Sequence, residues 1–424
     1  MPLGHQARPP SRSTTGVLLT TAAASLRRLA CGAMRSIGDF GRFLVVLGSV
    51  LAVAACGTAA HQASAAGPAS APRMTSPAAS PAPAASPTMT PTPKPKGSPA
   101  PPSQPLPRYG NPDGHAYVPP AGQAVSTGHP DHIIGNGTAA SCTSAAVVEA
   151  VAMGGVISFN CGPEPVTITM MQTANIVHGD LIVIDGGGKV TLSGGGKIRI
   201  LDMDTCPGCW EQAGPHLIVQ NMRFVDGYSG AHQVSGSADY GGGAIFDQGG
   251  QLTVVNSAFV DNGCYQYGPD LGGGAIRAYG MDMNTPVYLT DDTFRGNTCS
   301  NGGAVSGLYA NFVLTNSLLT GNKAIGWGAN PAQAGTPGGG SGGGVYTDGN
   351  NYNLIIDGTV IRSDSAREGG GAIFCVIDNG QGVLTVENSD LHGNPSGEFQ
   401  NAPGIFDSLD GHDVQPTVID SAIS

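Results

Sequence analysis

The sequence predicts an all-β solenoid, in which short strands joined by turns form similar coils that stack along one axis. The first observation is a phrase that occurs five times: a glycine pair, then Ala or Gly, then a β-branched residue. The copies lie at residues 242–245, 273–276, 302–305, 342–345 and 370–373. Their starts are 31, 29, 40 and 28 residues apart, which is a repeat period with one insertion.

The second observation is an alternating apolar run that ends in Asn and is followed by an apolar residue and another Asn. The clearest copy consists of Leu252, Val254, Asn256, Phe259 and Asn262. The copy that begins at Val287 repeats it 35 residues later, looser copies begin at Leu217, Phe312 and Leu384, and the copy at Leu354 keeps the register. A period of two indicates strands and argues against helical repeats. Because a lone coil cannot bury its apolar face, the coils must stack around a continuous core.

The third observation is the choice of corner residues. The chain has 66 Gly among 424 residues and only 6 % aromatic residues, without a Gly-X-Y period, which indicates a turn-dense β structure rather than collagen. Glycine suits corners that need a positive φ or close backbone approach. Asn tolerates the left-handed region, and stacked Asn residues can pair from coil to coil. In the copy at Leu354, Gly358 and Asp364 replace the two Asn residues.

The first coils and a cap are expected upstream of the glycine repeats. Alternating apolar residues between 156 and 192 predict the first strands. Residues 144–152 predict a short helix with Ser144 as candidate N-cap, and Cys142 and Cys161 bracket it. A disulfide between these cysteines would pin the helix over the first coil, because an open solenoid end exposes strand edges and apolar core.

The two alternating phrases carry a family resemblance. Gly-Gly-Ala-Ile alternating with Phe-x-x-Asn, at residues 259–262 and 294–297, resembles the repeat pair of the polymorphic outer membrane proteins. These belong to the wider right-handed parallel β-helix, pectate-lyase-like superfamily. The resemblance covers about residues 135 to 424 and implies a right-handed parallel β-helix with a short N-terminal capping helix. It says little about activity.

The N-terminal region predicts export and a lipid anchor. Arg35 and Arg42 precede the apolar run 43–52, and small residues lead to Cys56. A basic flank, an apolar core and small residues form an export signal. Small residues directly before a Cys resemble the lipobox of bacterial lipoproteins. The apolar run is too short to span a bilayer. We therefore expect a signal peptide over 34–55, lipidation at Cys56, and an untranslated or extra segment over 1–33.

Residues 56–110 are largely Ala, Pro, Ser and Thr, which predicts an extended linker, and residues 111–424 form the expected β-helix domain. The domain has nine basic and 29 acidic residues, a formal charge of about −20. Nucleic acid is excluded as an expected partner, because binding its phosphates needs a basic surface. The expected location is the cell surface, tethered to the membrane through the lipid, or the secreted fraction.

The cysteine pattern fits an oxidising compartment. Besides the pair around the predicted helix, Cys264 and Cys299 are 35 residues apart, one repeat step, and can bond between adjacent coils. Cys206 and Cys209 have the spacing of a redox motif, but no βαβ pattern surrounds them, which favours a structural loop disulfide. No second pair completes a zinc site, and no other metal site is predicted. Cys375 is then the odd thiol, expected to be buried.

Four insertions depart from the repeats and are expected as loops on one face of the solenoid, where ligands bind. Aromatic residues lie on or beside them: Trp210, Tyr228, Tyr240, Tyr265, Tyr267 and Trp327. Exposed aromatic rings that stack on sugars would form a glycan-binding groove. Packing of these loops against the coil wall is the alternative, and the sequence leaves both open.

Catalytic chemistry is the other alternative. Pectate-lyase-like lyases use acidic calcium ligands with an Arg or Lys base, and related hydrolases use paired carboxylates. The candidates are Asp202, Asp204, Asp292 and Arg277. Asp291 occupies the repeat's Asn position and is expected to be a turn residue. Neighbouring strand residues point to opposite faces, so an Asp pair there need not converge. Calcium is the cofactor that this alternative implies.

The sequence thus predicts a surface-anchored β-helix lipoprotein that binds a polysaccharide or a surface protein, as an adhesin or glycan-binding module of the cell envelope. A polysaccharide lyase or hydrolase is the second hypothesis, and a passive envelope spacer is the third. Fold alone does not choose among them.

Overall fold

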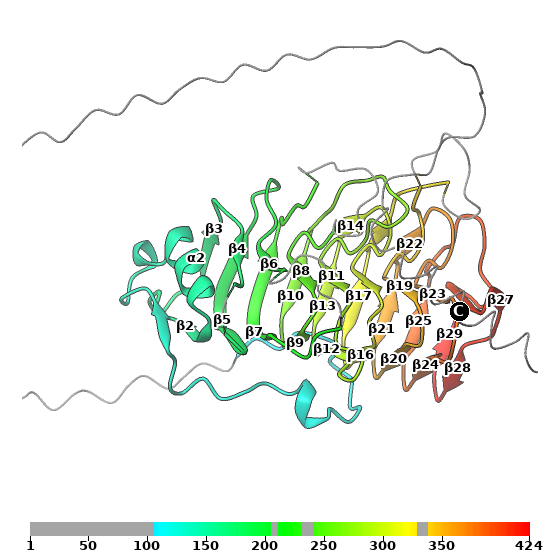
Figure 1. Cartoon of the computed structure of the whole chain (residues 1–424), viewed down its shortest axis with the longest axis horizontal. Helices are drawn as coiled ribbons and strands as arrows, with labels where there is room; N and C mark the ends of the chain where they lie inside the picture. The colour runs from blue at the N-terminus through cyan, green and yellow to red at the C-terminus, as the bar shows by residue number, and fades with distance from the viewer. Residues whose placement is uncertain (1–105, 178, 205–210, 231–240, 329–337) are drawn as a thin grey trace, which may run out of the picture. The chain divides into compact units, whose positions relative to one another are not determined.

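Parallel β-strands arranged in three long columns form the framework of the folded chain (Figure 1). The computed structural model describes residues 106–177, 179–204, 211–230, 241–328 and 338–424. These residues belong to the compact unit Lys96–Ser424. Each strand pairs in parallel with the equivalent strand of the neighbouring repeat, except the antiparallel β26–β27 pair. Predominant β structure in parallel sheets is confirmed, and the arrangement is compatible with a solenoid.

The first and second columns form one sheet of 17 strands, because β5 (Leu181–Ser193) and β7 (His216–Val225) run through both. The other first-column strands are β1 (His132–Ile134), β2 (Gly155–Phe159), β9 (Gln251–Val255), β12 (Val287–Thr290), β16 (Phe312–Thr315), β20 (Asn353–Asp357), β24 (Val383–Glu387) and β28 (Thr417–Ile419). The other second-column strands are β3 (Val166–Thr169), β10 (Ala258–Val260), β13 (Thr293–Arg295), β17 (Leu318–Thr320), β21 (Val360–Arg362), β25 (Asp390–His392) and β29 (Ala422–Ile423).

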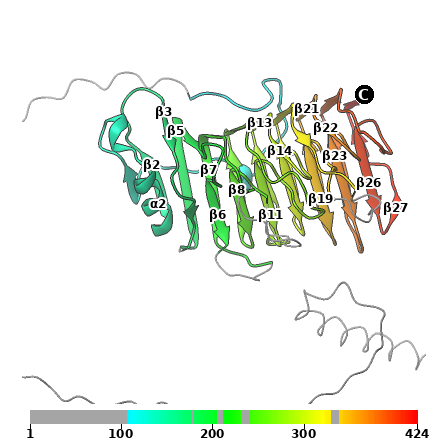
Figure 2. The same ribbon diagram turned by 90° about the horizontal axis from the view of Figure 1, so that it is seen from above.

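The third column is a separate sheet of nine strands, seen side by side in Figure 2. It contains β4 (Ala174–Asn175), β6 (Leu201–Asp204), β8 (Ile245–Gln248), β11 (Ile276–Tyr279), β15 (Val305–Leu308), β19 (Val345–Gly349), β23 (Ile373–Ile377), β26 (Ile405–Leu409) and β27 (His412–Asp413). A small sheet of β14 (Thr298–Cys299), β18 (Lys323–Ala324) and β22 (Ser365–Ala366) follows the second column. The predicted Gly-Gly-Ala-Ile phrases thus lead into third-column strands.

The helix α2 (Ser144–Met153) lies where the sequence predicts it, and it packs beside β1 and β4. Its N-cap is Thr143, one residue before the predicted Ser144, because the Thr143 side chain accepts a hydrogen bond from the backbone N–H of Ala146. The Oγ of Ser144 instead accepts the N–H of Met171. Two 3₁₀ turns, η2 (Pro120–Gly122) and η3 (Ala139–Ser141), complete the helical elements of the described residues, none of which is a helix long and apolar enough to cross a membrane.

Both disulfides that the sequence predicts within the described residues form. Cys142 and Cys161 are bonded with their Cα atoms 5.6 Å apart, and Cys264 and Cys299 are bonded at 4.7 Å. The second bond links neighbouring repeats, as their 35-residue separation predicted. Cys375 is a buried free thiol, also as predicted. Cys206 and Cys209 lie outside the described residues, as does Cys56.

The corner between the first and second columns is built from Asn and its replacements. Asn256 has φ 47°, Asn316 φ 52° and Asn388 φ 49°, and Asp291 takes the same place with φ 55°. The left-handed region is rarely adopted except by Gly, Asn and Asp, because it brings Cβ close to the backbone. The prediction that Asp291 is a turn residue is therefore confirmed by its backbone.

The second Asn of each repeat forms a buried ladder that runs along the stack. In Asn297, the backbone N–H donates to the Oδ1 of Asn322 at 3.0 Å, and its side-chain Nδ2 donates to the same oxygen at 2.9 Å. Asn262 makes the same two bonds to Asn297. Asn322 makes them to the Oδ1 of Asp364. We call this set, with Asn394, the Asn ladder; it confirms the predicted pairing from coil to coil.

A second buried ladder uses hydroxyl groups and one carboxyl group in the same way. The backbone N–H of Ser257 donates to the Oδ1 of Asp292, and the N–H of Asp292 donates to the Oγ of Ser317. Thr359 and Ser389 continue the series. Burial raises the pKa of Asp292 well above its ordinary value. Asp292, a sequence-predicted catalytic candidate, is thus an interior group that links neighbouring coils.

The interior between the columns is filled by stacked apolar side chains. The rings of Phe224, Phe259 and Phe294 stack face to face, with centroids 5.0 and 4.9 Å apart. Leu319 and Ile361 continue this row in register and are fully buried. One residue of the predicted Phe-x-x-Asn phrase therefore packs the core, while the Asn three positions later joins the ladder.

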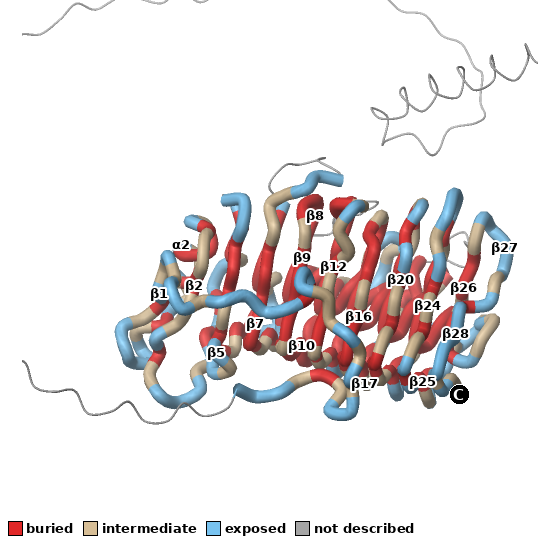
Figure 3. Tube along the Cα trace, turned by 90° about the horizontal axis from the view of Figure 1, so that it is seen from below, coloured by how far each residue is buried: buried red, intermediate tan, exposed pale blue. Residues whose placement is uncertain are grey.

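A segment over 106–131 runs along the outside of the first and second columns (Figure 3). The backbone N–H of Tyr109 donates to the Oδ1 of Asn256. Ala116 donates its N–H to the Oδ1 of Asn316 and accepts the Nδ2 of the same side chain. Contacts with the folded unit thus begin before residue 111, where the sequence analysis placed the start of the domain.

The Asn ladder generates a stability prediction at Asp364, where the carboxyl replaces an amide. Its Oδ1 accepts both Asn322 donors, but its Oδ2 is buried without a hydrogen-bond partner. The equivalent Nδ2 of Asn322 donates to a backbone carbonyl. Burial raises the pKa of Asp364 well above 3.8. Stability from the neutral acid is therefore complete below pH 3.8 and is lost as pH rises toward the folded-state pKa.

Asp364→Asn is expected to raise the free energy of unfolding at pH 7 by about 1–3 kcal/mol, because it removes a buried unsatisfied acid and restores a donor. The gain should shrink toward pH 4. Thermal unfolding midpoints measured between pH 4 and 8 test this. Asn297→Asp is the matched control and should lower the midpoint at pH 7. A midpoint for Asp364→Asn that is unchanged or lower at pH 7 would contradict the ladder argument.

Candidate functional site

The outer face of the third column carries a second, separate cluster of large side chains. Inward residues of these strands, such as Ile276 and Val345, belong to the main core. Outward residues alternate with them and include Tyr279, Leu308, Tyr346 and Phe374, which form their own cluster. The rings of Tyr346 and Phe374 stack at 5.0 Å. This outer face and the loops beside it are the candidate site.

Arg277 is fixed on this face by the loop that precedes β11. It is fully buried; its Nη1 donates to the Oγ of Ser306, and its Nη2 donates to the backbone oxygen of Asp270. The guanidinium also lies 5.9 Å from the centre of the Tyr279 ring. Burial lowers the pKa of Arg277 from its usual value. The side chain holds the loop against the sheet, and its burial keeps it from reaching an external substrate.

Three carboxylates, those of Asp348, Asp378 and Asp270, form what we call the acidic group. Asp348 lies near the carboxyl end of β19. The Tyr346 hydroxyl donates to the Oδ2 of Asp348 at 3.0 Å. Burial, and then the nearby charge of Asp378, raise the pKa of Asp348 to about 6, and Asp270 contributes further. Burial, and then the negative charges of the same three carboxylates, raise the pKa of Tyr309. Among the described residues no group of three His, Cys, Asp or Glu side chains has the arrangement of a metal site, so calcium stays a prediction.

The four sequence-predicted catalytic candidates do not converge. Asp202 forms an ion pair with Arg199 on the outer face of β6. Asp204 is exposed at the end of the same strand. Arg277 lies two strands away in the same outward row, about 10 Å along the sheet. Asp292 is in the interior ladder of the other columns. No acid–base pair across one groove results from this set.

The predicted glycan-binding aromatics that the structure describes lie on one side of the stack. Tyr228 is half-buried and pairs through its backbone with Gly263, directly before the loop of Tyr265 and Tyr267. The two rings of that loop meet edge to face at 5.7 Å. Trp327 is half-buried on a later loop, and the Arg367 guanidinium lies 5.0 Å from its ring centre. Trp210 and Tyr240 lie outside the described residues.

The loops of Tyr265 and Trp327 contact each other beside the candidate site. The backbone N–H of Gly268 donates to the oxygen of Gly338, which pairs with Trp327. Ser300 donates its hydroxyl to the oxygen of Gly268. Because Arg277 holds Asp270 of the first loop, the aromatic loops and the outer face of the third column are one connected surface. That surface carries both aromatic rings and carboxylates.

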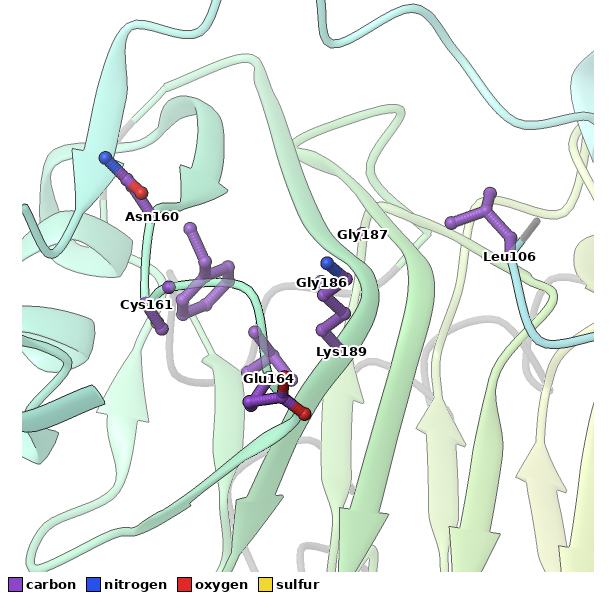
Figure 4. Close-up of a pocket in the computed structure, with 10 residues that line it drawn as sticks. Leu106, Asn160, Cys161, Glu164, Gly186, Gly187 and Lys189 are labelled. Carbon is purple, nitrogen blue, oxygen red and sulfur yellow. The ribbon is translucent and has the colours of Figure 1, made fainter. Parts of the chain in front are cut away.

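A pocket of about 310 Å³ lies elsewhere, near the first coils (Figure 4). Leu106, Phe159 and Glu164 contribute to its wall, together with Lys189. The Nζ of Lys189 already donates to the backbone oxygen of Pro163. The pocket has no aromatic pair, and it lies apart from the candidate site.

The central residues of the acidic group were not among the sequence-predicted site residues. Tyr346 and Asp348 lie in the strand after the fourth glycine phrase, one and three residues after Val345. Their register with Arg277 and Tyr279 follows from the repeat period, so aligning the repeats could have placed them beside each other. Asp378 and Asp270 sit in loops, where no periodicity gives their position.

Comparison of the chain with protein-family models, with curated proteins and with solved structures gives no match. The resemblance to polymorphic outer membrane protein repeats therefore stays a prediction from the residues that carry it. The functional argument rests on the geometry of the candidate site.

The acidic group generates a titration prediction. Tyr346→Phe removes the hydrogen bond that favours the charged form of Asp348, so its pKa should rise above about 6 by about one unit. Carbon NMR titration of the Asp carboxyl signals measures this. Tyr288→Phe, in the first column, is the matched control and should leave the Asp348 titration unchanged. An Asp348 pKa that stays the same in Tyr346→Phe would sink the assigned interaction.

Proposed function

We propose that this protein is an exported lipoprotein with a right-handed parallel β-helix of the pectate-lyase-like type, whose repeats are similar to those of polymorphic outer membrane proteins. The lipid on Cys56 anchors it, residues 56–110 are the spacer, and the β-helix presents a glycan-binding surface. The partner is a polysaccharide of the cell envelope or of a host surface, and the protein acts as an adhesin or recognition module.

One observation carries the binding proposal. Tyr265, Tyr267 and Trp327 lie on two loops that contact each other, and these loops adjoin the outer face that carries Tyr346 and Asp348. Aromatic rings offer apolar faces to sugar rings at low entropic cost, while carboxylates and hydroxyls accept and donate hydrogen bonds to sugar hydroxyls. The buried state of Arg277 and the scatter of the other catalytic candidates favour binding over turnover.

A polysaccharide hydrolase or lyase is the second candidate, and the acidic group favours it. Asp348 has a pKa of about 6, and the charge of Asp378 contributes to that shift. A carboxyl group that titrates near neutral pH can act as a general acid. In that case Asp348 would replace Asp202, Asp204 and Asp292 as the group to test.

The binding proposal is tested with full-length protein, offered a panel of acidic and neutral polysaccharides with and without calcium. We expect retention on at least one immobilised glycan without new reducing or unsaturated ends. Trp327→Ala and Tyr265→Ala should each weaken retention about tenfold, as expected for loss of one aromatic contact. Tyr117→Ala, whose ring is 77 % exposed on the 106–131 segment, is the matched control.

Product formation that Asp348→Asn abolishes would instead make the protein an enzyme. Retention that neither aromatic substitution weakens would reject the aromatic loops as the binding surface. Silence of the whole panel would leave the passive spacer as the better account.

The anchoring proposal is tested separately in a host that processes bacterial lipoproteins. Cys56→Ser should move the protein from the membrane fraction to the soluble exported fraction, because it removes the acceptor of the lipid. Ser64→Ala, in the predicted linker, is the control and should leave the protein in the membrane. Equal membrane retention of Cys56→Ser and the unmodified chain would rule out the lipid anchor at this position.

A further inference from the structure

The few basic residues of the β-helix domain are unevenly placed. Residues 111–424 contain nine Lys and Arg residues. Three of them, Arg223, Arg295 and Arg362, lie in the second column, on β7, β13 and β21. These strands run side by side through β10 and β17 in Figure 1. These three second-column positions thus hold a third of the basic residues of a strongly acidic domain.

The three guanidinium groups belong to the outer face of this sheet. Phe294 and Ile361, directly before Arg295 and Arg362, are fully buried in the core. Because successive strand residues point to opposite faces, the arginines point outward. Both are exposed, whereas Arg223, next to the buried Phe224, is half-buried. Arg223 lies near Tyr109 of the 106–131 segment, whose Gly110 donates its N–H to Thr293 on β13, so the segment borders this end of the face.

None of the three arginines is neutralised by the part of the chain that the structure describes. The two ion pairs found there join Arg199 to Asp202 and His392 to Asp390. The three arginines also make no side-chain hydrogen bond with described residues, although the domain has 29 acidic residues to offer. Asp390, which pairs in register with Val360 on the same face, is instead 3.1 Å from the Nδ1 of His392. The carboxylate of Asp261 lies beside Gly296, next to Arg295 in the chain, and forms no ion pair with it.

The spacing of the charges is regular along the stack. Arg295 pairs in register with Thr320, and Thr320 pairs with Arg362, so the two arginines are two strands apart. Arg223 is two strands away from Arg295 on the other side, two residues earlier along its strand. With strands about 4.8 Å apart, the charges repeat about every 10 Å along the axis. This is close to the length of two sugar units in an extended chain.

From this row we infer that the outer face of the second column binds a linear acidic polysaccharide that carries one carboxylate or sulfate per disaccharide. The inference rests on the proposed glycan-binding function and specifies the class of glycan. It places this binding on a face other than that of the aromatic loops. The polymer lies along the stack, with successive anions on Arg223, Arg295 and Arg362. Guanidinium groups bind carboxylates and sulfates through paired, charge-assisted hydrogen bonds.

The acidity of the whole domain does not oppose this binding at short range. The Debye length is about 8 Å at physiological ionic strength, so more distant carboxylates are largely screened. The local row of unpaired arginines then decides the interaction. The screening also predicts that added salt weakens binding, because the contacts themselves are exposed.

The experiment measures retention of full-length protein on immobilised polymers at 0.15 M salt. The probes are hyaluronan with one carboxylate per disaccharide, polygalacturonate with one per sugar, neutral dextran and single-stranded DNA. We expect the strongest binding to hyaluronan. R295A/R362A should weaken it at least tenfold, and R295K/R362K less. K189A/K197A removes the same charge from the first coils and should change it less than twofold.

The outcomes separate this inference from the proposed function. Hyaluronan binding that R295A/R362A and K189A/K197A weaken equally would overturn the arginine row. Equal retention on DNA would show unspecific polyanion binding and overturn the ligand class. Retention on a neutral glycan only, lost in Trp327→Ala, would keep the proposed function and overturn the inference, whereas silence on every glycan would overturn both. Circular dichroism of each variant establishes that it is folded.

Discussion

The structure depends on hydrogen bonds that side chains make to the backbone of the preceding repeat. In the Asn ladder, one side-chain oxygen of Asn297 accepts both the backbone N–H and the Nδ2 of Asn262, and Asn322 does the same for Asn297. Polar backbone groups at a buried corner would otherwise lack partners, which costs about as much as a lost hydrogen bond. The ladder therefore fixes the register of one repeat on the next, while the stacked Phe residues fill the space beside it.

The fixed register determines which functional groups lie next to each other on the outer faces. On the third column it places Tyr346 one strand from Ser306, whose hydroxyl accepts a hydrogen bond from Arg277. Asp348, on the same strand as Tyr346, accepts the hydrogen bond of the Tyr346 hydroxyl. On the second column it sets exposed arginines two strands apart. A shift of one residue in a single repeat would turn the outward side chains of that repeat into the core. The two faces can thus be read as rows of functional groups on a rigid spacing.

Much of the fold could be predicted because the repeat is written in the sequence. Period-two alternation predicted the strands, and the glycine phrases marked the repeats whose strands form the third column. Asn256 predicted a turn at the corner, and Asn262 predicted pairing of Asn residues from coil to coil. The disulfide of Cys264 and Cys299 followed from one repeat step. The candidate site was less predictable, since its carboxylates come partly from loops without periodicity. Asp292 was a catalytic candidate in the sequence, but it lies in the interior ladder. A carboxyl group that replaces a ladder hydroxyl cannot be told from a catalytic one by sequence alone.

The most direct test of this account is hydrogen exchange at the backbone amides of Asn262, Asn297 and Asn322. These N–H groups donate to side-chain oxygens rather than to a strand partner. If the ladder holds the repeats in register, they exchange as slowly as the amides of the neighbouring core strands. Fast exchange at all three, with slow exchange in the strands, would contradict it, because the stack would then be held by strand pairing and apolar packing alone.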